Sequence, residues 1–222
     1  MSSTRICSSA AFLCLFACAS LAAPIVPVSQ TRSLAASASH PSGTPSSDMQ
    51  AAPDFGEFSE RASATSGPLG DRVQVFVQQR SMIHEDSIHM VVDGLGLRSL
   101  TGGDGDASSI FDVSFDLTVT SEYDLMYNGL ASSFTSTGGA LSDSTGVLLD
   151  FLPVTEQTGI LGPGRYRIEI FATGRAADTE DEGRIHQHLD LFFTPVPEPS
   201  TASLLVAAFA VLAVARGSAR RR

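Results

Sequence analysis

The chain has 222 residues, of which 24 are acidic and 14 are basic, so its formal net charge at pH 7 is −10. Such an acidic chain repels phosphate backbones, which excludes nucleic acid as an expected partner. All three cysteines lie within the first 18 residues and tryptophan is absent. A disulfide framework in the rest of the chain and a binding face built on tryptophan are therefore excluded as well.

Residues 1–22 have the features of a secretory signal peptide. Arg5 is the only charge ahead of an apolar core, Ala10–Ala19, and small residues follow that core. Ser20 and Ala22 occupy the two small-residue positions that cleavage after Ala22 requires. We therefore expect export, with the three cysteines removed and no disulfide in the mature chain.

Residues 23–70 are rich in serine, alanine, proline and glycine and contain few aromatic side chains. A segment of this composition does not bury enough apolar surface to offset the entropy lost on ordering. We therefore expect a disordered linker. Phe55 and Phe58 are the exceptions, and they either dock as a short element or remain exposed in a flexible arm.

Residues 71–195 show hydrophobic alternation with a period of two, which is typical of β-strands. The clearest run extends from Phe111 to Thr120. The same pattern places three further sets of side chains on the buried side of their strands, namely Val73, Val75 and Val77, then Tyr123, Tyr127 and Tyr166, and finally Leu189, Leu191 and Phe193. We expect the segment from Arg72 to Thr194 to fold alone, stabilised by a packed apolar core.

Turn signals separate these predicted strands. Asn128-Gly129 lies between two apolar runs, which predicts a hairpin, and Gly162-Pro163-Gly164-Arg165 predicts a type II turn. Seven to nine short strands with such turns predict an all-β fold. The expected architecture is an antiparallel β-sandwich of the jelly-roll or immunoglobulin-like kind.

Two groups of histidines are candidates for chemistry. His186, His188 and Asp190 project from one face of the last predicted strand, and a His-x-His pair can chelate zinc. The alternative is an outward polar face, because the opposite alternation is the apolar one, and we favour this alternative. The second group runs from His84 to His89, and the sequence does not determine its distance from the first.

Two acidic loops, Gly102–Asp106 and Asp178–Glu182, contain oxygen ligands suited to calcium. Neither completes a calcium-loop pattern, so we expect a turn at the first loop and a solvated hairpin at the second. The chain has no Gly-x-Ser-x-Gly motif, and its carboxylates form no evident catalytic pair. The sequence accordingly predicts no catalytic residue and no cofactor, with calcium left as an option.

Residues 196–222 have three successive parts. Pro197, Glu198 and Pro199 impose an extended backbone, and an apolar run follows from Thr201 to Ala215. As a helix this run is about 22 Å long, shorter than the roughly 30 Å hydrocarbon core, and so predicts a marginal transmembrane helix. Cationic residues behind it keep the C-terminus in the cytoplasm: Arg216, Arg220, Arg221 and Arg222.

The order of these three parts at the end of the chain resembles the PEP-CTERM sorting signal of Gram-negative bacteria. In that family an exosortase, which is an integral membrane cysteine transpeptidase-like enzyme, recognises the signal and the mature protein reaches the cell surface or the extracellular matrix. The resemblance implies an exosortase-type partner, a transient inner-membrane intermediate with a cytoplasmic C-terminus, and then a surface or extracellular location. The segment Leu161–Tyr166 is also similar to the Leu-x-Pro-Gly-x-Tyr sequence that family members often carry before a strand.

We therefore expect an exported, non-enzymatic surface or matrix protein whose sandwich domain contacts exopolysaccharide, as in a biofilm, or other envelope proteins. The alternative is a secreted hydrolase or metal-dependent enzyme on the same scaffold. That alternative requires an acid, a base or a metal to converge at one place, for which the sequence offers only the histidine candidates. A third possibility is a purely structural spacer.

Overall fold

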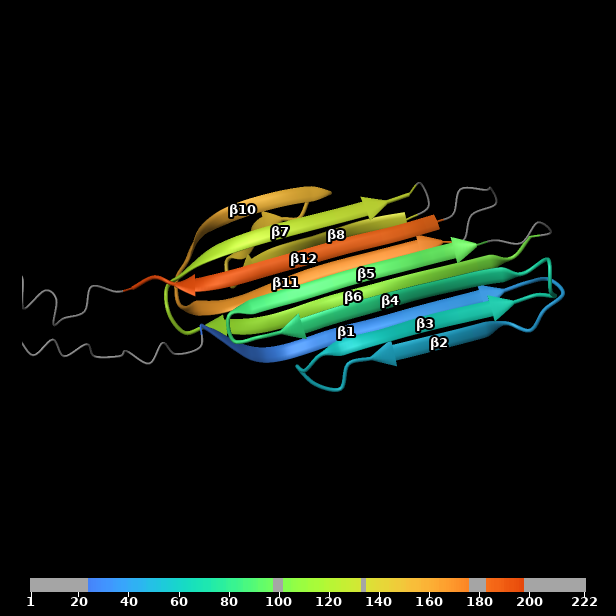
Figure 1. The fold of residues 1–222 in the computed structure, drawn as a ribbon, viewed down its shortest axis with the longest axis horizontal. Coiled ribbons are helices and arrows are strands. Elements are labelled where there is room, and N and C mark those ends of the chain that lie inside the picture. The colour runs from blue at the N-terminus through green and yellow to red at the C-terminus, as the bar shows by residue number, and fades with distance from the viewer. Residues whose placement is uncertain (1–23, 98–101, 133–134, 176–182, 198–222) are drawn as a thin grey trace, which may run out of the picture.

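The computed structural model describes residues 24–97, 102–132, 135–175 and 183–197. These residues form two six-stranded antiparallel sheets (Figure 1). Sheet A has the order β2-β1-β6-β11-β8-β9, and sheet B has the order β10-β7-β12-β5-β4-β3. The strands are β1 (Ile25–Ser39), β2 (Ser46–Ala51), β3 (Phe58–Ser66), β4 (Val73–Ile83), β5 (Ser87–Leu97), β6 (Asp104–Leu117), β7 (Ser121–Ala131), β8 (Thr135–Asp143), β9 (Gly146–Asp150), β10 (Val154–Leu161), β11 (Gly164–Arg175) and β12 (Gly183–Pro195).

The two sheets share one hydrophobic core, which gives a β-sandwich. Alternate side chains of most strands point into this core, and those of the runs Val73–Val77, Phe111–Leu117 and Leu189–Phe193 do so with exposures of 3% or less. Tyr123, Tyr127 and Tyr166 are buried, as predicted. The described residues contain no helix, so none of them provides a helical membrane span.

The expectation of a disordered linker over residues 23–70 is wrong, because this segment supplies β1, β2 and β3. β1 lies between β2 and β6, and its inward side chains include Leu34, Ala36 and Ala38. These inward residues alternate with Ser33, Ala35, Ser37 and Ser39, which is the pattern of a strand. The average composition hides this pattern, and β6 supplies the large side chains that the segment lacks.

A buried arginine ties this segment to the opposite sheet. The Arg32 side chain is 1% exposed. Its Nε donates to Gln30 Oε1 at 3.2 Å, its Nη1 donates to Ser81 Oγ at 3.1 Å, and its Nη2 donates to the carbonyls of Gly56, at 2.8 Å, and Asp54. Burial lowers the pKa of the guanidinium, and the charge of Asp54 partly opposes that shift. Arg32 therefore fixes the β2–β3 connection against β4 without a carboxylate at hydrogen-bonding distance among the described residues.

The two expected turns are also corrected. β7 runs straight through Asn128 and Gly129 and pairs there with β12. A Cβ at Gly129 would lie 2.5 Å from Tyr127 Oη, so this glycine makes room for a buried ring rather than for a turn. At the second site Gly164 does not have the positive φ of a type II turn. Instead the Tyr166 hydroxyl donates to the Gly162 carbonyl at 2.9 Å, the kind of contact that closes tyrosine corners in β-sandwiches.

The chain enters and leaves the sandwich at the same end, which we call the pole. The Thr118 amide donates to the Pro24 carbonyl at 2.9 Å, and the Val196 amide donates to the Thr120 carbonyl at 2.9 Å. The start of β1 and the end of β12 therefore meet at the connection between β6 and β7 (Figure 1). The expected signal peptide and, beyond Pro197, the expected sorting tail lie outside the described residues.

Candidate functional site

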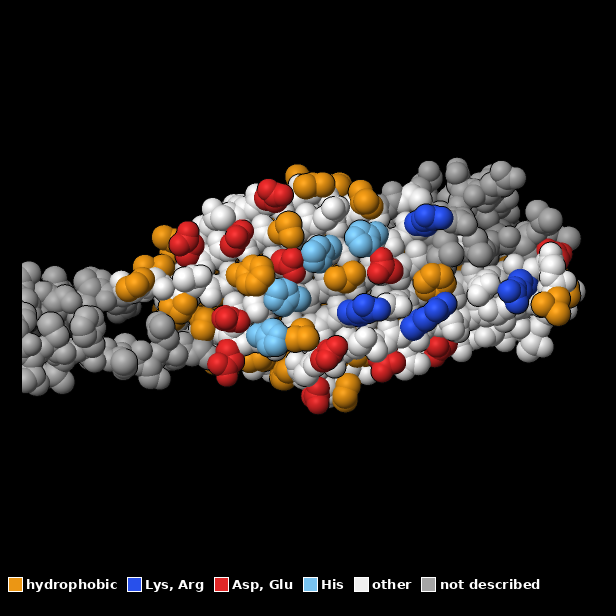
Figure 2. Space-filling view, viewed as in Figure 1, with side chains coloured by type: hydrophobic (Ala, Val, Ile, Leu, Met, Phe, Trp, Pro, Cys, Tyr) orange, Lys and Arg blue, Asp and Glu red, His pale blue; other side chains and the backbone are white. Residues whose placement is uncertain are grey.

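The histidine candidates of the last strand lie on the outer face of sheet B. In β12 the side chains of Leu189 and Leu191 are fully buried, so His186, His188 and Asp190 point away from the core. This is the outward polar face that the alternation predicts. Figure 2 shows histidine side chains gathered near the middle of this face among acidic side chains.

The neighbouring strand β5 completes the group with His89 and Asp93. His186 Nδ1 lies 2.7 Å from Asp93 Oδ1, and His89 Nδ1 lies 2.7 Å from Asp190 Oδ1. His188 Nε2 lies 3.1 Å from the second oxygen of Asp190. These five side chains form the histidine–aspartate cluster, in which the Asp190 carboxylate is placed between two imidazoles.

Aromatic side chains border the cluster. The His84 ring lies edge-to-face with the His89 ring at 6.3 Å between centroids, and Phe192 meets the other edge of His89 at 5.0 Å. The Phe192 ring is 47% exposed. A hollow of about 290 Å³ opens beside it, and its lining consists of Asp124, Leu125, Met126, Glu156, Asp190 and Phe192.

The cluster has the hydrogen-bonding pattern that carboxylate–imidazole pairs use to fix a histidine tautomer and to hold a proton. In hydrolases such a pair acts on a nucleophile within an enclosed site. Here the hollow beside Phe192 contains one carboxylate of the cluster and none of its imidazoles. The arrangement provides exposed donors and acceptors for a polar ligand on an open sheet face.

The sequence did not indicate that His89 and Asp93 lie beside His186 and Asp190 of β12. They face Asp190 and His186 across an antiparallel pair whose partners are 101 and 93 positions apart in the chain. The outward spacing of His89, Val91 and Asp93 was the available signal. It assigns these residues to one face of a strand without identifying the strand beside them.

The first acidic loop is used in ion pairs. Arg175 Nη2 lies 3.2 Å from Asp104 Oδ1, and Arg175 Nε lies 4.0 Å from Asp106 Oδ1. Asp104 and Asp106 lie in β6 and not in the expected turn. Gly102 and Gly103, just before β6, have φ values of 103° and 137°, which accounts for glycine at these two positions. The second loop, Asp178–Glu182, lies outside the described residues, as do the sorting residues Glu198, Pro199, Arg216, Arg220, Arg221 and Arg222.

A measurement of bound zinc tests whether the histidine–aspartate cluster is a metal centre or a hydrogen-bonded surface. Within residues 24–97, 102–132, 135–175 and 183–197, no group of three or more histidine, cysteine, aspartate or glutamate side chains is arranged to hold a metal ion. We expect the dialysed wild-type chain and a His186→Ala/His188→Ala chain to retain equally little zinc by elemental analysis. We also expect their free energies of unfolding to agree within about 1 kcal/mol, since exposed ion pairs contribute little. One equivalent of zinc in the wild type alone would identify a metal centre.

Comparison with known proteins assigns the chain to no family. No family model and no curated protein matches the chain. Among solved structures the chain has a distant similarity to a GH31 alpha-xylosidase from Xanthomonas citri, with 10% sequence identity and a TM-score of 0.19. The similarity covers 78% of this chain and 28% of the xylosidase chain. A TM-score this low indicates neither a shared fold nor a shared activity.

Proposed function

We propose that this chain is an exported surface or extracellular-matrix protein, processed through a PEP-CTERM and exosortase system, whose β-sandwich is a non-enzymatic binding module for exopolysaccharide. The proposal rests on where the two predicted targeting segments join the sandwich. Residues 1–22 and 196–222 flank a sandwich whose chain enters and leaves at a single pole. A membrane-embedded tail at that pole leaves both outer sheet faces accessible.

The absence of an enzymatic role is supported by the environment of the histidine–aspartate cluster. His186 is 47% exposed and Asp93 is 53% exposed at the side-chain level, so water reaches this pair directly. Catalytic acid–base groups gain most of their effect where water is excluded. A hydrolase is the second candidate, because imidazole–carboxylate contacts such as the three in this cluster are the part that such an enzyme would need.

The finer fold that we propose is of the jelly-roll kind. From β9 onward the chain alternates between the sheets at every strand, with β9 and β11 in sheet A and β10 and β12 in sheet B. Crossing from sheet to sheet in this way is characteristic of double-sheet Greek-key folds. The tyrosine-corner contact between Tyr166 and Gly162 favours the same group of folds.

Replacing Pro197, Glu198 and Pro199 by alanines tests the sorting proposal. The signal peptide is unchanged in this variant, so we expect export to continue. The variant should, however, remain uncut in the inner membrane, because the proposed recognition segment is lost while the apolar run is kept. The measurement is the apparent mass and fractionation of the protein, followed through an epitope inserted at Ser42, in a Gram-negative host that carries an exosortase. Ser42 is exposed in the β1–β2 connection.

The matched control is a host without the exosortase, where the wild-type chain should behave like the alanine variant. A wild-type chain that stays full length and membrane-bound in both hosts would contradict the sorting proposal. The tail would then be an anchor that is not processed.

A further inference from the structure

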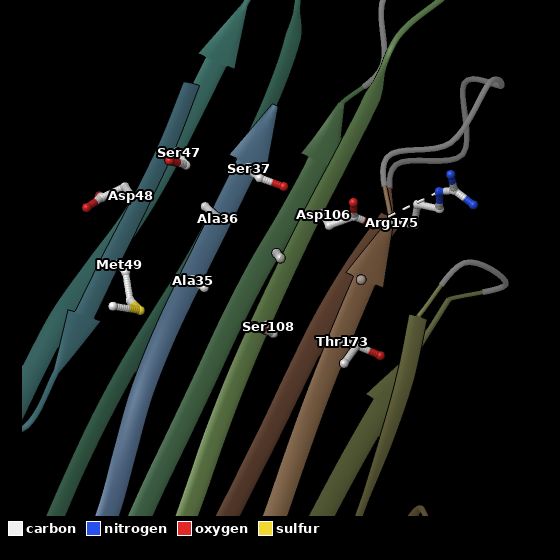
Figure 3. A pocket seen from close by; sticks show the side chains of 12 residues that line it. Ala35, Ala36, Ser37, Ser47, Asp48, Met49, Asp106, Ser108, Thr173 and Arg175 are labelled. Atoms are coloured by element: carbon white, nitrogen blue, oxygen red, sulfur yellow. Dashed lines mark ion pairs between the residues drawn. The ribbon is translucent and has the colours of Figure 1, made fainter. Parts of the chain in front are cut away.

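A groove crosses the outer face of sheet A, on the side of the sandwich opposite the histidine–aspartate cluster. Its volume is about 680 Å³, and residues of β2, β1, β6 and β11 line it (Figure 3). Small side chains form its floor, because Ala35, Ser108 and Thr173 stand side by side on three adjacent strands. The groove runs across the strands over about 15 Å, which is three strand spacings.

The two rims of the groove differ in chemistry. On one side Asp106 and Arg175 form an ion pair at 4.0 Å, and Ser37 stands opposite Asp106 on the neighbouring strand. On the other side, outside the lining and one outward position beyond Ser108 and Thr173, Ile110 and Phe171 stand opposite each other, and each is 43% exposed. The Phe171 ring lies over Gly138, where a Cβ would be 2.9 Å from the ring. The groove therefore has polar groups along one rim, and an apolar ledge formed by Ile110 and Phe171 lies beside it on the other side.

The arginines around the groove are already paired with carboxylates. Arg167 holds Asp112 with two hydrogen bonds of 2.8 Å, and Arg165 holds Asp116 at 2.8 and 3.1 Å. With Arg175 beside Asp104 and Asp106 at the rim, these arginines are neutralised by carboxylates, and Asp48 in the lining adds a further negative charge, so this face repels an anionic polymer. The formal charge of −10 further disfavours a polyanion.

The backbone around the groove is also paired. β1, β6 and β11 each have a strand on both sides, so their amide and carbonyl groups are used within sheet A. An extended peptide binds a sheet by adding a strand at an edge, which the floor of this groove does not provide. The polar side chains that line the groove include the hydroxyl groups of Ser37, Ser47, Ser108 and Thr173, which both donate and accept.

We propose that this groove binds a segment of a linear, uncharged polysaccharide. Sugar hydroxyls would exchange hydrogen bonds with the serine and threonine hydroxyls, while the apolar faces of the sugar rings would pack on Phe171 and Ile110. The inference deepens the proposed function by assigning the exopolysaccharide contact to a site. Along β1 the groove at Ser37 lies about 40 Å from Ile25, where the chain enters the sandwich, so a tail in the membrane leaves the groove exposed.

Filling the groove tests the assignment. Ala35→Leu and Ser108→Leu together place two large side chains on the floor. The matched control is Ser114→Leu, on the same face of β6 but outside the groove. The full-length proteins, in mild detergent, are run through native gels containing hydroxyethyl cellulose, dextran or laminarin as neutral probes and alginate as an anionic probe.

We expect at least one neutral polysaccharide to retard the wild type, and alginate not to do so. The double variant should bind that polysaccharide at least tenfold more weakly, and Ser114→Leu should stay within twofold of the wild type. Retardation by no neutral probe, or equal retardation of the double variant and the wild type, would overturn the assignment. Loss of binding in Phe192→Ala but not in the double variant would place the contact on sheet B instead. Since the assay uses purified protein, a failure of sorting leaves its outcome unchanged.

Discussion

A chain carrying Leu34→Asp is expected to show no cooperative thermal unfolding, whereas a chain carrying Ser33→Asp is expected to unfold like the wild type. The two positions are adjacent in β1 but face opposite sides of sheet A, and Leu34 is 1% exposed. If residues 23–70 were a disordered linker, neither substitution would matter. The pair therefore tests directly whether β1 belongs to the sandwich.

The size of the effect follows from two costs. Loss of a buried leucine removes about 1.5–3 kcal/mol of hydrophobic stabilisation, and burial of a carboxylate costs several kcal/mol more unless the group is neutralised. Their sum is comparable with the whole stability of a domain, about 5–15 kcal/mol. Far-ultraviolet circular dichroism during heating measures the result. Identical, wild-type transitions for both variants would contradict the position of β1.

Deletion of residues 24–70 should have the same outcome as Leu34→Asp, because it removes Ile25, Leu34 and Phe58 from the core and leaves β4 and β6 as unpaired edges. The segment from Arg72 to Thr194 is therefore not expected to fold alone, contrary to the expectation from composition. A cooperative transition in the deleted chain would show that β1, β2 and β3 are dispensable.

The substitution Arg32→Ala is expected to lower the free energy of unfolding by about 3 kcal/mol. Hydrogen bonds to a charged group are worth about 1.5–3 kcal/mol each, and Ser81 Oγ, in a side chain that is 3% exposed, would keep only the hydrogen bond that Gln79 donates. The packing of the guanidinium at 5.7 Å from the Phe58 ring centre would also be lost. Denaturant unfolding of the full chain measures the change.

Two further variants make the test specific. Arg32→Lys should recover little of the lost stability, because an ammonium group has three donors and lacks the planar fork that reaches Gln30, Ser81 and Gly56 together. Arg80→Ala removes an exposed arginine of β4 and should change stability by no more than about 0.5 kcal/mol. Equal effects of Arg32→Ala and Arg80→Ala would show that the buried network does not stabilise the fold.

The two outer faces of the sandwich differ in character. Sheet B presents the histidine–aspartate cluster beside the exposed Phe192, while sheet A presents paired arginines and aspartates and the groove. Under the proposed function both faces stand clear of the membrane, because the chain enters and leaves at one pole. The zinc measurement addresses the first face, and the polysaccharide gels address the second.

Several features of this protein were determined by the sequence alone. Alternation with a period of two is a local property, so it correctly identified β-strands and their buried sides at Val73–Val77, Phe111–Leu117 and Leu189–Phe193. It also placed His186, His188 and Asp190 together on an outward face. The resemblance of the tail to a sorting signal is likewise a local reading, and it stays a prediction.

Other features were decided only by the tertiary structure. The alanine- and serine-rich β1 forms a strand because β6 and β2 supply hydrogen bonds and β6 also supplies large buried side chains, which the composition of residues 23–70 does not reveal. Gly129 leaves space for the buried Tyr127 ring, although the dipeptide Asn-Gly by itself indicates a turn. The contacts of His89 with Asp190 and of His186 with Asp93 depend on the register between β5 and β12. Register is set by packing between segments about a hundred residues apart, so no local pattern contains it.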